Sequence, residues 1–89
     1  MELIRVNGAR STVPYSSALK VLQTYVGGYI EFFGFADGTS LIVNEEGKLE
    51  GLPINHAATA LTASKGRPEI IAGDALFLSA AEMKTANDD

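Results

Sequence analysis

Residues 27–55, GGYIEFFGFADGTSLIVNEEGKLEGLPIN, decide the fold. Strand-forming residues fill positions 29–36 and 39–44, and Asp37 and Gly38 stand between the two runs. Asp-Gly is typical of a two-residue type I′ turn, because Gly adopts positive φ freely and Asp tolerates it. The sequence therefore predicts a β-hairpin that turns at Asp37 and Gly38.

A two-residue turn would also fix which residues share a face of this hairpin. One face would pack under the helices and would carry Ile30, Phe32, Leu41 and Val43. The other would carry Tyr29, Phe33, Phe35 and Ile42, with Glu31 and Asn44 among them. An apolar patch of this kind is seldom left exposed on a small monomer. We therefore expect this second face to be a self-association surface of a homo-oligomer, since a two-fold interface would cover it.

The segments on either side of the hairpin complete a single domain over residues 1–89. Residues 2–6 and 10–13 predict short strands, and apolar spacings of three and four predict a helix over 18–26. After the hairpin, Asn55 is expected to cap a helix over 56–64.

The last strand is expected within residues 69–79, with a break at Gly73 and Asp74 that is either a bulge or a tight turn. Residues 79–89 predict a short C-terminal helix and a tail, because Ser79 and Glu82 have the spacing of a capping box. The fold class is thus α+β in the order β(β)αββαβ, with two helices on one face of a four- to five-stranded sheet.

Composition excludes several classes of protein. The net charge is −4 and the pI is about 4.8, whereas proteins that bind nucleic acid need clustered Lys and Arg to displace counterions. We therefore expect no nucleic-acid partner. The chain has no cysteine, which excludes disulfides and thiolate metal sites. No apolar run is long enough to span a bilayer and no secretory signal is visible, so we expect a soluble intracellular protein with no membrane partner.

Several strings in the chain resemble one known family. They are VGGYIE at 26–31, IVNEEGKLEGLPIN at 42–55, an Ala-Thr pair shortly after, and IIAGDALFL at 70–78. They are similar to short proteins of bacteriophages and mobile elements that are catalogued only as a domain of unknown function. The resemblance covers about residues 19–78. Within that range, this chain departs from the family pattern at Phe33, Phe35 and segment 57–65. It implies a phage-type accessory protein in the cytoplasm of a host bacterium.

No constellation of residues predicts an enzyme. His56 is the only histidine, and no cysteine or serine nucleophile accompanies it, so we expect it to face solvent in the first turn of its helix. Glu45, Glu46 and Asp74 lack the alternating oxygen ligands of a calcium loop. We therefore predict no catalytic residue, no metal and no cofactor.

The sequence favours a binding protein instead. The amides at the start of a helix capped by Asn55 could hold a phosphate or carboxylate, although every capped helix has this feature. With Phe33 or Phe35 beside them, the residues expected to bind a small anionic or nucleotide ligand are Asn44, Lys48, Asn55, His56 and Arg67. The predicted function is to counter host defence by sequestering such a ligand between protomers. The alternative is an inhibitor or adaptor that masks a host protein.

Overall fold

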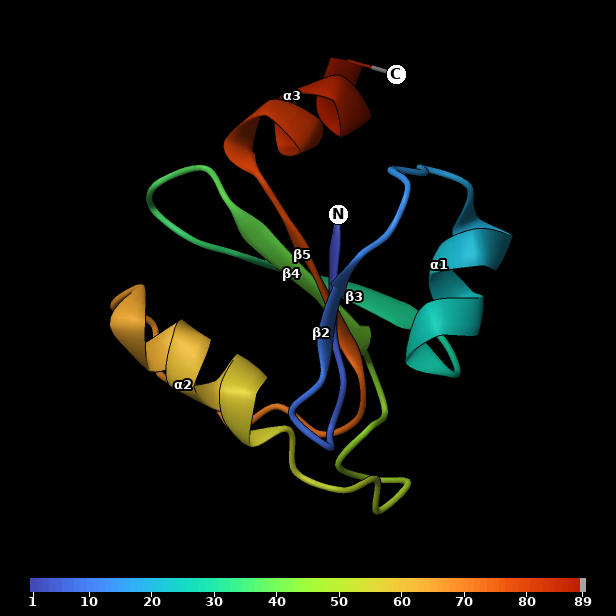
Figure 1. Ribbon diagram of the computed structural model, residues 1–89, viewed down its shortest axis with the longest axis vertical. Coiled ribbons are helices and arrows are strands. Elements are labelled where there is room, and N and C mark those ends of the chain that lie inside the picture. Colours follow the sequence, from blue (N-terminus) through green and yellow to red (C-terminus); the bar gives the residue numbers. More distant parts are fainter. Residues whose placement is uncertain (89) are drawn as a thin grey trace.

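The computed structural model describes residues 1–88; Asp89, the last residue of the predicted tail, lies outside the described residues (Figure 1). The elements in chain order are β1 (Glu2–Ile4), β2 (Arg10–Thr12), α1 (Leu19–Val26), β3 (Ile30–Gly34), β4 (Ser40–Asn44), α2 (His56–Ser64), β5 (Ala75–Leu78) and α3 (Ala80–Asp88). The α+β class and the predicted order of elements are confirmed.

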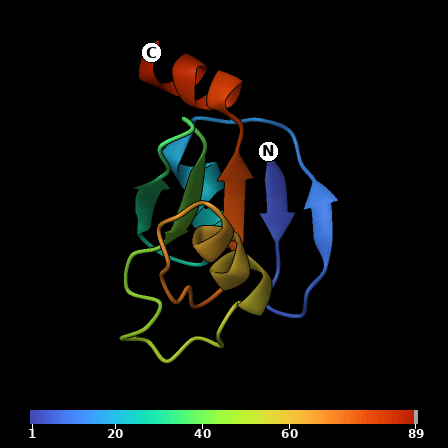
Figure 2. The same ribbon diagram turned by 90° about the vertical axis from the view of Figure 1, so that its left-hand side faces the viewer.

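One antiparallel sheet contains all five strands, in the order β2-β1-β5-β4-β3. Strand β5 lies in the centre and pairs with β1 on one side and β4 on the other. The break before it is a bend, at which Gly73 has a φ of 88° and donates its N–H to the Pro53 carbonyl at 2.8 Å. The two ends of the sheet are β2 and β3, as Figure 2 shows.

The helices cover both faces of the sheet rather than one. Helix α1 packs Leu22 and Val26 into a cluster with Ile42 of β4, whereas Ala58 of α2 packs into a cluster with Leu41 and Val43. Figure 2 shows α2 in front of the sheet and α1 behind it. The predicted layering therefore differs from the structure, because β4 is buried at every position and a strand that is apolar on both sides needs cover on both.

The hairpin turn has three residues instead of two. The Phe35 N–H donates to the Thr39 carbonyl at 2.9 Å, and the Gly38 N–H donates to the Phe35 carbonyl at 3.1 Å. Gly38 has a φ of 88°, but Asp37 does not have the positive φ that a type I′ turn requires. Instead, Asp37 Oδ1 accepts from the Thr39 N–H at 3.0 Å, a local bond that favours this longer loop.

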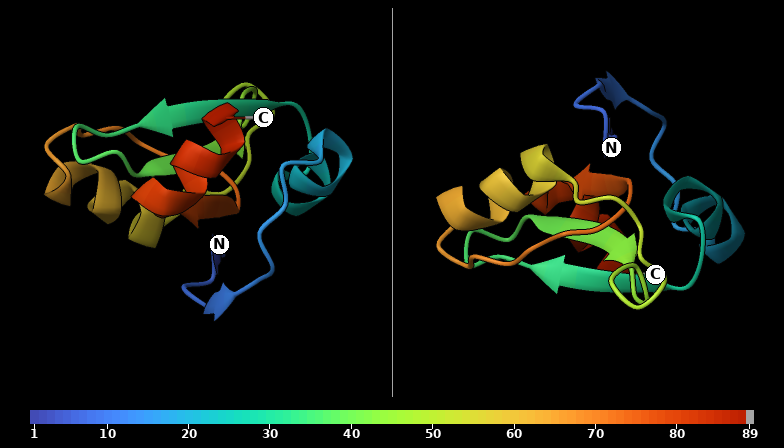
Figure 3. Two further views of the ribbon diagram at one scale, coloured as in Figure 1. Left: turned by 90° about the horizontal axis from the view of Figure 1, so that it is seen from above. Right: turned by 90° about the horizontal axis from the view of Figure 1, so that it is seen from below.

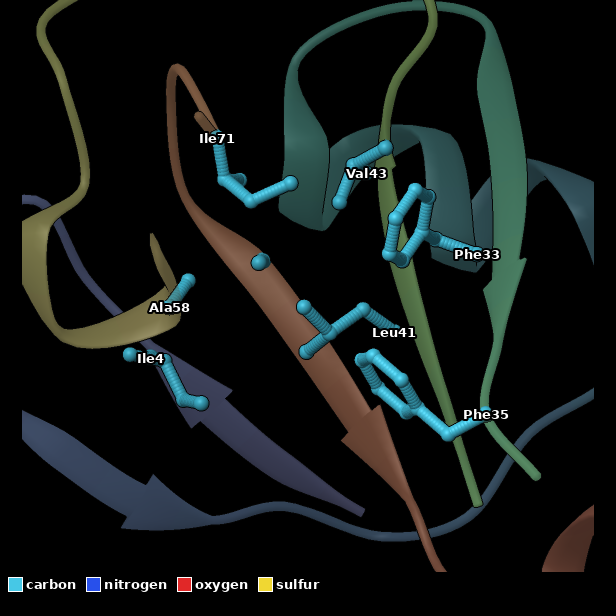
Figure 4. Packing of buried hydrophobic residues seen from close by; sticks show 8 residues of the cluster. Ile4, Phe33, Phe35, Leu41, Val43, Ala58 and Ile71 are labelled. Atoms are coloured by element: carbon cyan, nitrogen blue, oxygen red, sulfur yellow. The ribbon is translucent and has the colours of Figure 1, made fainter. Parts of the chain in front are cut away.

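The longer loop shifts the register of the hairpin by one residue and rearranges its faces. Phe33 pairs with Leu41, and Phe33 and Phe35 join the cluster on the α2 side, where they are 8% and 9% exposed (Figure 4). Ile42 is fully buried on the α1 side, so the predicted self-association face of four side chains does not form. Of the four, Tyr29 alone is exposed. Phe32, predicted to be buried, is 48% exposed.

The C-terminal helix is anchored at its start. The Ser79 N–H donates to Glu82 Oε1 at 3.0 Å and the Glu82 N–H donates to Ser79 Oγ at 3.2 Å, which confirms the predicted capping box. The other carboxylate oxygen of Glu82 accepts from the Met1 ammonium at 2.8 Å. Within residues 1–88, every helix is too short or too polar to cross a bilayer.

Candidate functional site

A surface cavity of about 410 Å³ lies where the open end of the β3–β4 hairpin meets two loops. The loops are residues 45–52 and residues 69–72, and we call the space between them the hairpin cavity. Its buried wall is apolar and is formed by Phe33, Val43 and Ile71. Its exposed rim is formed by Glu31, Glu45, Lys48, Leu49, Glu69 and Ile70. Both its volume and its apolar wall are typical of small-molecule sites.

The NEEGKL segment builds one side of this cavity by folding into a tight loop. Asn44 is buried, and its Oδ1 accepts from the Glu46 N–H at 2.8 Å. Its Nδ2 donates to the Val26 carbonyl at 3.3 Å and to Glu50 Oε1 at 3.1 Å. A Cβ on Gly47 would lie 2.7 Å from the Ala72 carbonyl oxygen, so the two loops touch only because residue 47 is glycine.

Carboxylates dominate the charge at the rim. Lys48 and Glu69 form a side-chain hydrogen bond and ion pair, which holds the pKa of the Glu69 carboxyl below its ordinary value. Glu31 and Glu45 form no ion pair within the described part of the chain. The cavity therefore suits a molecule with an apolar body and several hydrogen-bond donors, and it repels a group of high negative charge.

Asn55 has a structural role that occupies its whole side chain. It is fully buried, and its Oδ1 caps α2 by accepting from the Ala58 N–H at 3.0 Å. Its Nδ2 donates to the Ile4 carbonyl at 2.9 Å and to the Gly73 carbonyl at 3.0 Å. The LPIN string thus joins the start of α2 to β1 and to the bend before β5. The N-cap prediction is confirmed.

Arg67 covers an aromatic side chain at the edge of the sheet. Its guanidinium carbon lies 3.9 Å from the centre of the Phe33 ring, and its Nη1 donates to the Gly34 carbonyl at 2.7 Å. Stacking of this kind is favourable because the ring face is electron-rich. Arg67 therefore closes the α2 side of β3, where Phe33 would otherwise meet solvent.

The five predicted ligand-binding residues do not converge on one place. Asn44 and Lys48 line the hairpin cavity, and Asn55 is buried beneath α2. His56 is exposed in the first turn of α2, and Arg67 lies over Phe33. The sequence did not indicate Leu49, Glu69 and Ile70 as lining residues. For Glu69 and Ile70 the reason is that no local pattern places segment 69–72 beside the hairpin. Ile71 of that segment packs against Phe33 and Val43 of the hairpin, which are distant in the sequence.

The acidic residues considered as metal ligands also lie apart. Glu45 lines the hairpin cavity, whereas Asp74 accepts from the Val6 N–H at 2.9 Å and lies 4.0 Å from Arg5. Across the described residues, no three acidic or histidine side chains gather as a metal ion would require.

Comparison with known proteins gives one match. Residues 2–88 match a family described as a domain of unknown function, DUF3846. No curated protein and no solved structure matches the chain.

Proposed function

We propose, from the premise that this chain belongs to the DUF3846 family of unknown function, that it is a non-enzymatic protein that binds a small nucleotide-like molecule in the hairpin cavity. The observation that supports this most directly is the cavity itself, which combines an apolar wall with polar groups at one opening. A cavity of this composition is the default candidate for a ligand site.

The chemistry of the cavity narrows the class of ligand. A planar base would lie against Ile70, which is 53% exposed, with the largely buried Phe33 in the apolar wall of the same space. Glu31 and Glu45 would accept hydrogen bonds from amino or hydroxyl groups, and Lys48 would donate. Because carboxylates outnumber cations at the rim, a nucleoside or a nucleotide with few phosphates fits better than a polyphosphate.

The proposed biological role is that of a phage-type accessory protein. The support for it is the resemblance of residues 26–31, 42–55 and 70–78 to short phage and mobile-element proteins. In the cytoplasm of a host bacterium, such a protein would counter host defence by sequestering the ligand, which requires affinity and no turnover.

Titration calorimetry with a panel of nucleosides and nucleotides tests the proposal. The variant is Ile70→Ala, because Ile70 is 53% exposed at the rim, and the matched control is Ile54→Ala, which is 40% exposed and does not line the cavity. Loss of three carbon atoms from a half-covered contact is expected to weaken binding about tenfold. The control should bind as the wild type does. Failure of every compound in the panel to bind would contradict the proposal.

A second candidate function is supported by the apolar side chains at the rim. Leu49 is 89% exposed and Ile70 is 53% exposed, both beside the same cavity. Exposed apolar groups of this size are typical of surfaces that contact another protein. An inhibitor or adaptor that masks a host protein would retain one stoichiometric partner from a bacterial lysate, and Leu49→Asp would release it. If the wild type retains no protein, this alternative is excluded.

A further inference from the structure

Strand β3 ends the sheet and presents an open edge (Figure 3). The Tyr29 carbonyl accepts from the Glu45 N–H at 2.8 Å, and the Phe35 N–H donates to the Thr39 carbonyl at 2.9 Å. The odd-numbered residues of this segment therefore direct their backbone N–H and C=O groups toward β4. By the same alternation, the backbone groups of Ile30, Phe32 and Gly34 point away from the sheet. Within residues 1–88, no strand lies beside them.

Two side chains along this edge are also exposed to solvent, those of Glu31 and Phe32. Phe32 pairs with Ile42, so it projects on the α1 side, yet it remains 48% exposed because it stands at the margin of the sheet. On the α2 side, Glu31 is exposed and has no ion pair among the described residues. Next to it, Arg67 lies over Phe33 and reaches the Gly34 carbonyl on the open edge.

We propose that β3 pairs antiparallel with β3 of a second copy of this chain, about a two-fold axis at Phe32. Phe32 then faces the partner's Phe32, and Ile30 faces the partner's Gly34. All three outward-facing residues lie in hydrogen-bonded pairs of the new ladder. The Gly34 carbonyl already accepts from Arg67, and its second lone pair accepts from the partner's Ile30 N–H. The two phenylalanines form a cross-strand aromatic pair on the α1 side, which covers the exposed ring.

Charge complementarity selects a second copy over another strand. In this register Glu31 lies directly opposite the partner's Phe33, with Cβ atoms about 5 Å apart. Since Arg67 covers Phe33 in each protomer, Glu31 meets the partner's Arg67, and the two-fold axis repeats the contact. A two-fold pairing thus gives an opposite charge to the unpaired carboxylate of both chains.

The pairing needs no ligand in the hairpin cavity, although it brings the partner's Arg67 to Glu31 at the rim of that cavity. It also replaces the sheet-face contact expected from the sequence with an edge contact. Edge-to-edge pairing leaves α1 and α2 in place on the two faces of the sheet.

Sedimentation equilibrium of the purified protein without ligand tests the proposal. The wild type should show a concentration-dependent dimer. Glu31→Arg and Arg67→Glu should each weaken the dimer about tenfold, and the double variant should recover most of the affinity, because reversing both charges restores the contact. Thermal unfolding of each variant confirms that the monomer is folded.

Phe32→Glu should abolish the dimer, because it opposes two carboxylates at the axis. The control is Leu19→Glu on α1, which places the same charge at an apolar side chain that is 56% exposed and should leave dimerisation unchanged. A wild type that is monomeric at all concentrations would overturn the proposal, even if Phe32 captured some other protein. A dimer that persists in Phe32→Glu, or a double charge variant no stronger than the single ones, would overturn it equally.

Discussion

Replacing Asn55 with aspartate is expected to destabilise the fold strongly, although aspartate is itself a good N-cap. The new side chain keeps an oxygen for the Ala58 N–H, but it loses the two donors that reach the carbonyls of Ile4 and Gly73 at 2.9 and 3.0 Å. Each lost bond costs about 1 kcal/mol, and the buried carboxylate adds at least as much again, so the total is about 3 kcal/mol or more.

A loss of this size is large for a chain of this length. An 89-residue domain has a free energy of unfolding of about 4 to 13 kcal/mol, and about 3 kcal/mol lowers the Tm of a small domain by about 12 °C or more. Urea unfolding followed by circular dichroism is the assay. The midpoint should fall by about 1 to 3 M, given the m values of small proteins.

The matched control is Asn7→Asp, which makes the same chemical change at an exposed residue. Asn7 accepts from the Ala9 N–H at 2.9 Å through its Oδ1, which aspartate retains. We expect a change in unfolding free energy within about 0.5 kcal/mol. If the urea midpoints of Asn55→Asp and Asn7→Asp were the same, the two donors of Asn55 would contribute nothing and the reasoning would be refuted.

Three further predictions concern the hairpin and the cavity loop. Phe33→Ala should lower the free energy of unfolding, measured in urea, by about 3 kcal/mol, and Phe32→Ala should lower it by less than about 1 kcal/mol, because only the Phe33 ring is buried. The reverse order would contradict the observed register. Gly47→Ala should lower the free energy of unfolding by about 2 kcal/mol, because the added Cβ would lie 2.7 Å from the Ala72 carbonyl oxygen. Gly34→Ala has open space around the added Cβ and should lower it by less than about 1 kcal/mol. Equal urea midpoints for the two variants would contradict the close approach of the two loops. Hydrogen bonds from Lys65 and Thr39 hold the pKa of Asp37 well below its ordinary value of 3.8. The contribution of the Asp37 carboxylate to the free energy of unfolding is therefore present above pH 3.8 and is lost on further acidification. Asp37→Ala should lower the Tm at neutral pH, and the difference in Tm between the variant and the wild type should vanish in acid. A difference in Tm that is independent of pH would refute this.

Local patterns in the sequence predicted most of the elements. The spacing of apolar residues, the Asn55 cap and the Ser79–Glu82 capping box identified the helices, since each depends on neighbours within four residues. The predicted length of the hairpin turn was wrong by one residue, since the turn has three residues and not two. The Asp-Gly dipeptide fits both loop lengths, and the bond from the Thr39 N–H to Asp37 favours the longer one.

The candidate site was less predictable, because it depends on contacts between distant segments. Asn44 and Asn55 were predicted to bind a ligand. In the structure, the side chain of Asn44 donates to the Val26 carbonyl, and that of Asn55 donates to the Ile4 and Gly73 carbonyls. Segment 69–72 completes the cavity through contacts with distant residues, among them the packing of Ile71 with Phe33 and Val43 and the ion pair of Glu69 with Lys48. Nothing within segment 69–72 signals these contacts.

The central position of β5 has a consequence for how the protein is made. Strand β5 joins β1 to β4, yet it is the last strand to be synthesised. Until residues 75–78 emerge from the ribosome, the nascent chain holds two separate ribbons, each of which lacks its neighbour in the sheet. We expect the five-stranded sheet to close only after residues 75–78 have emerged, and a chain truncated before residue 75 to yield a product that proteases remove.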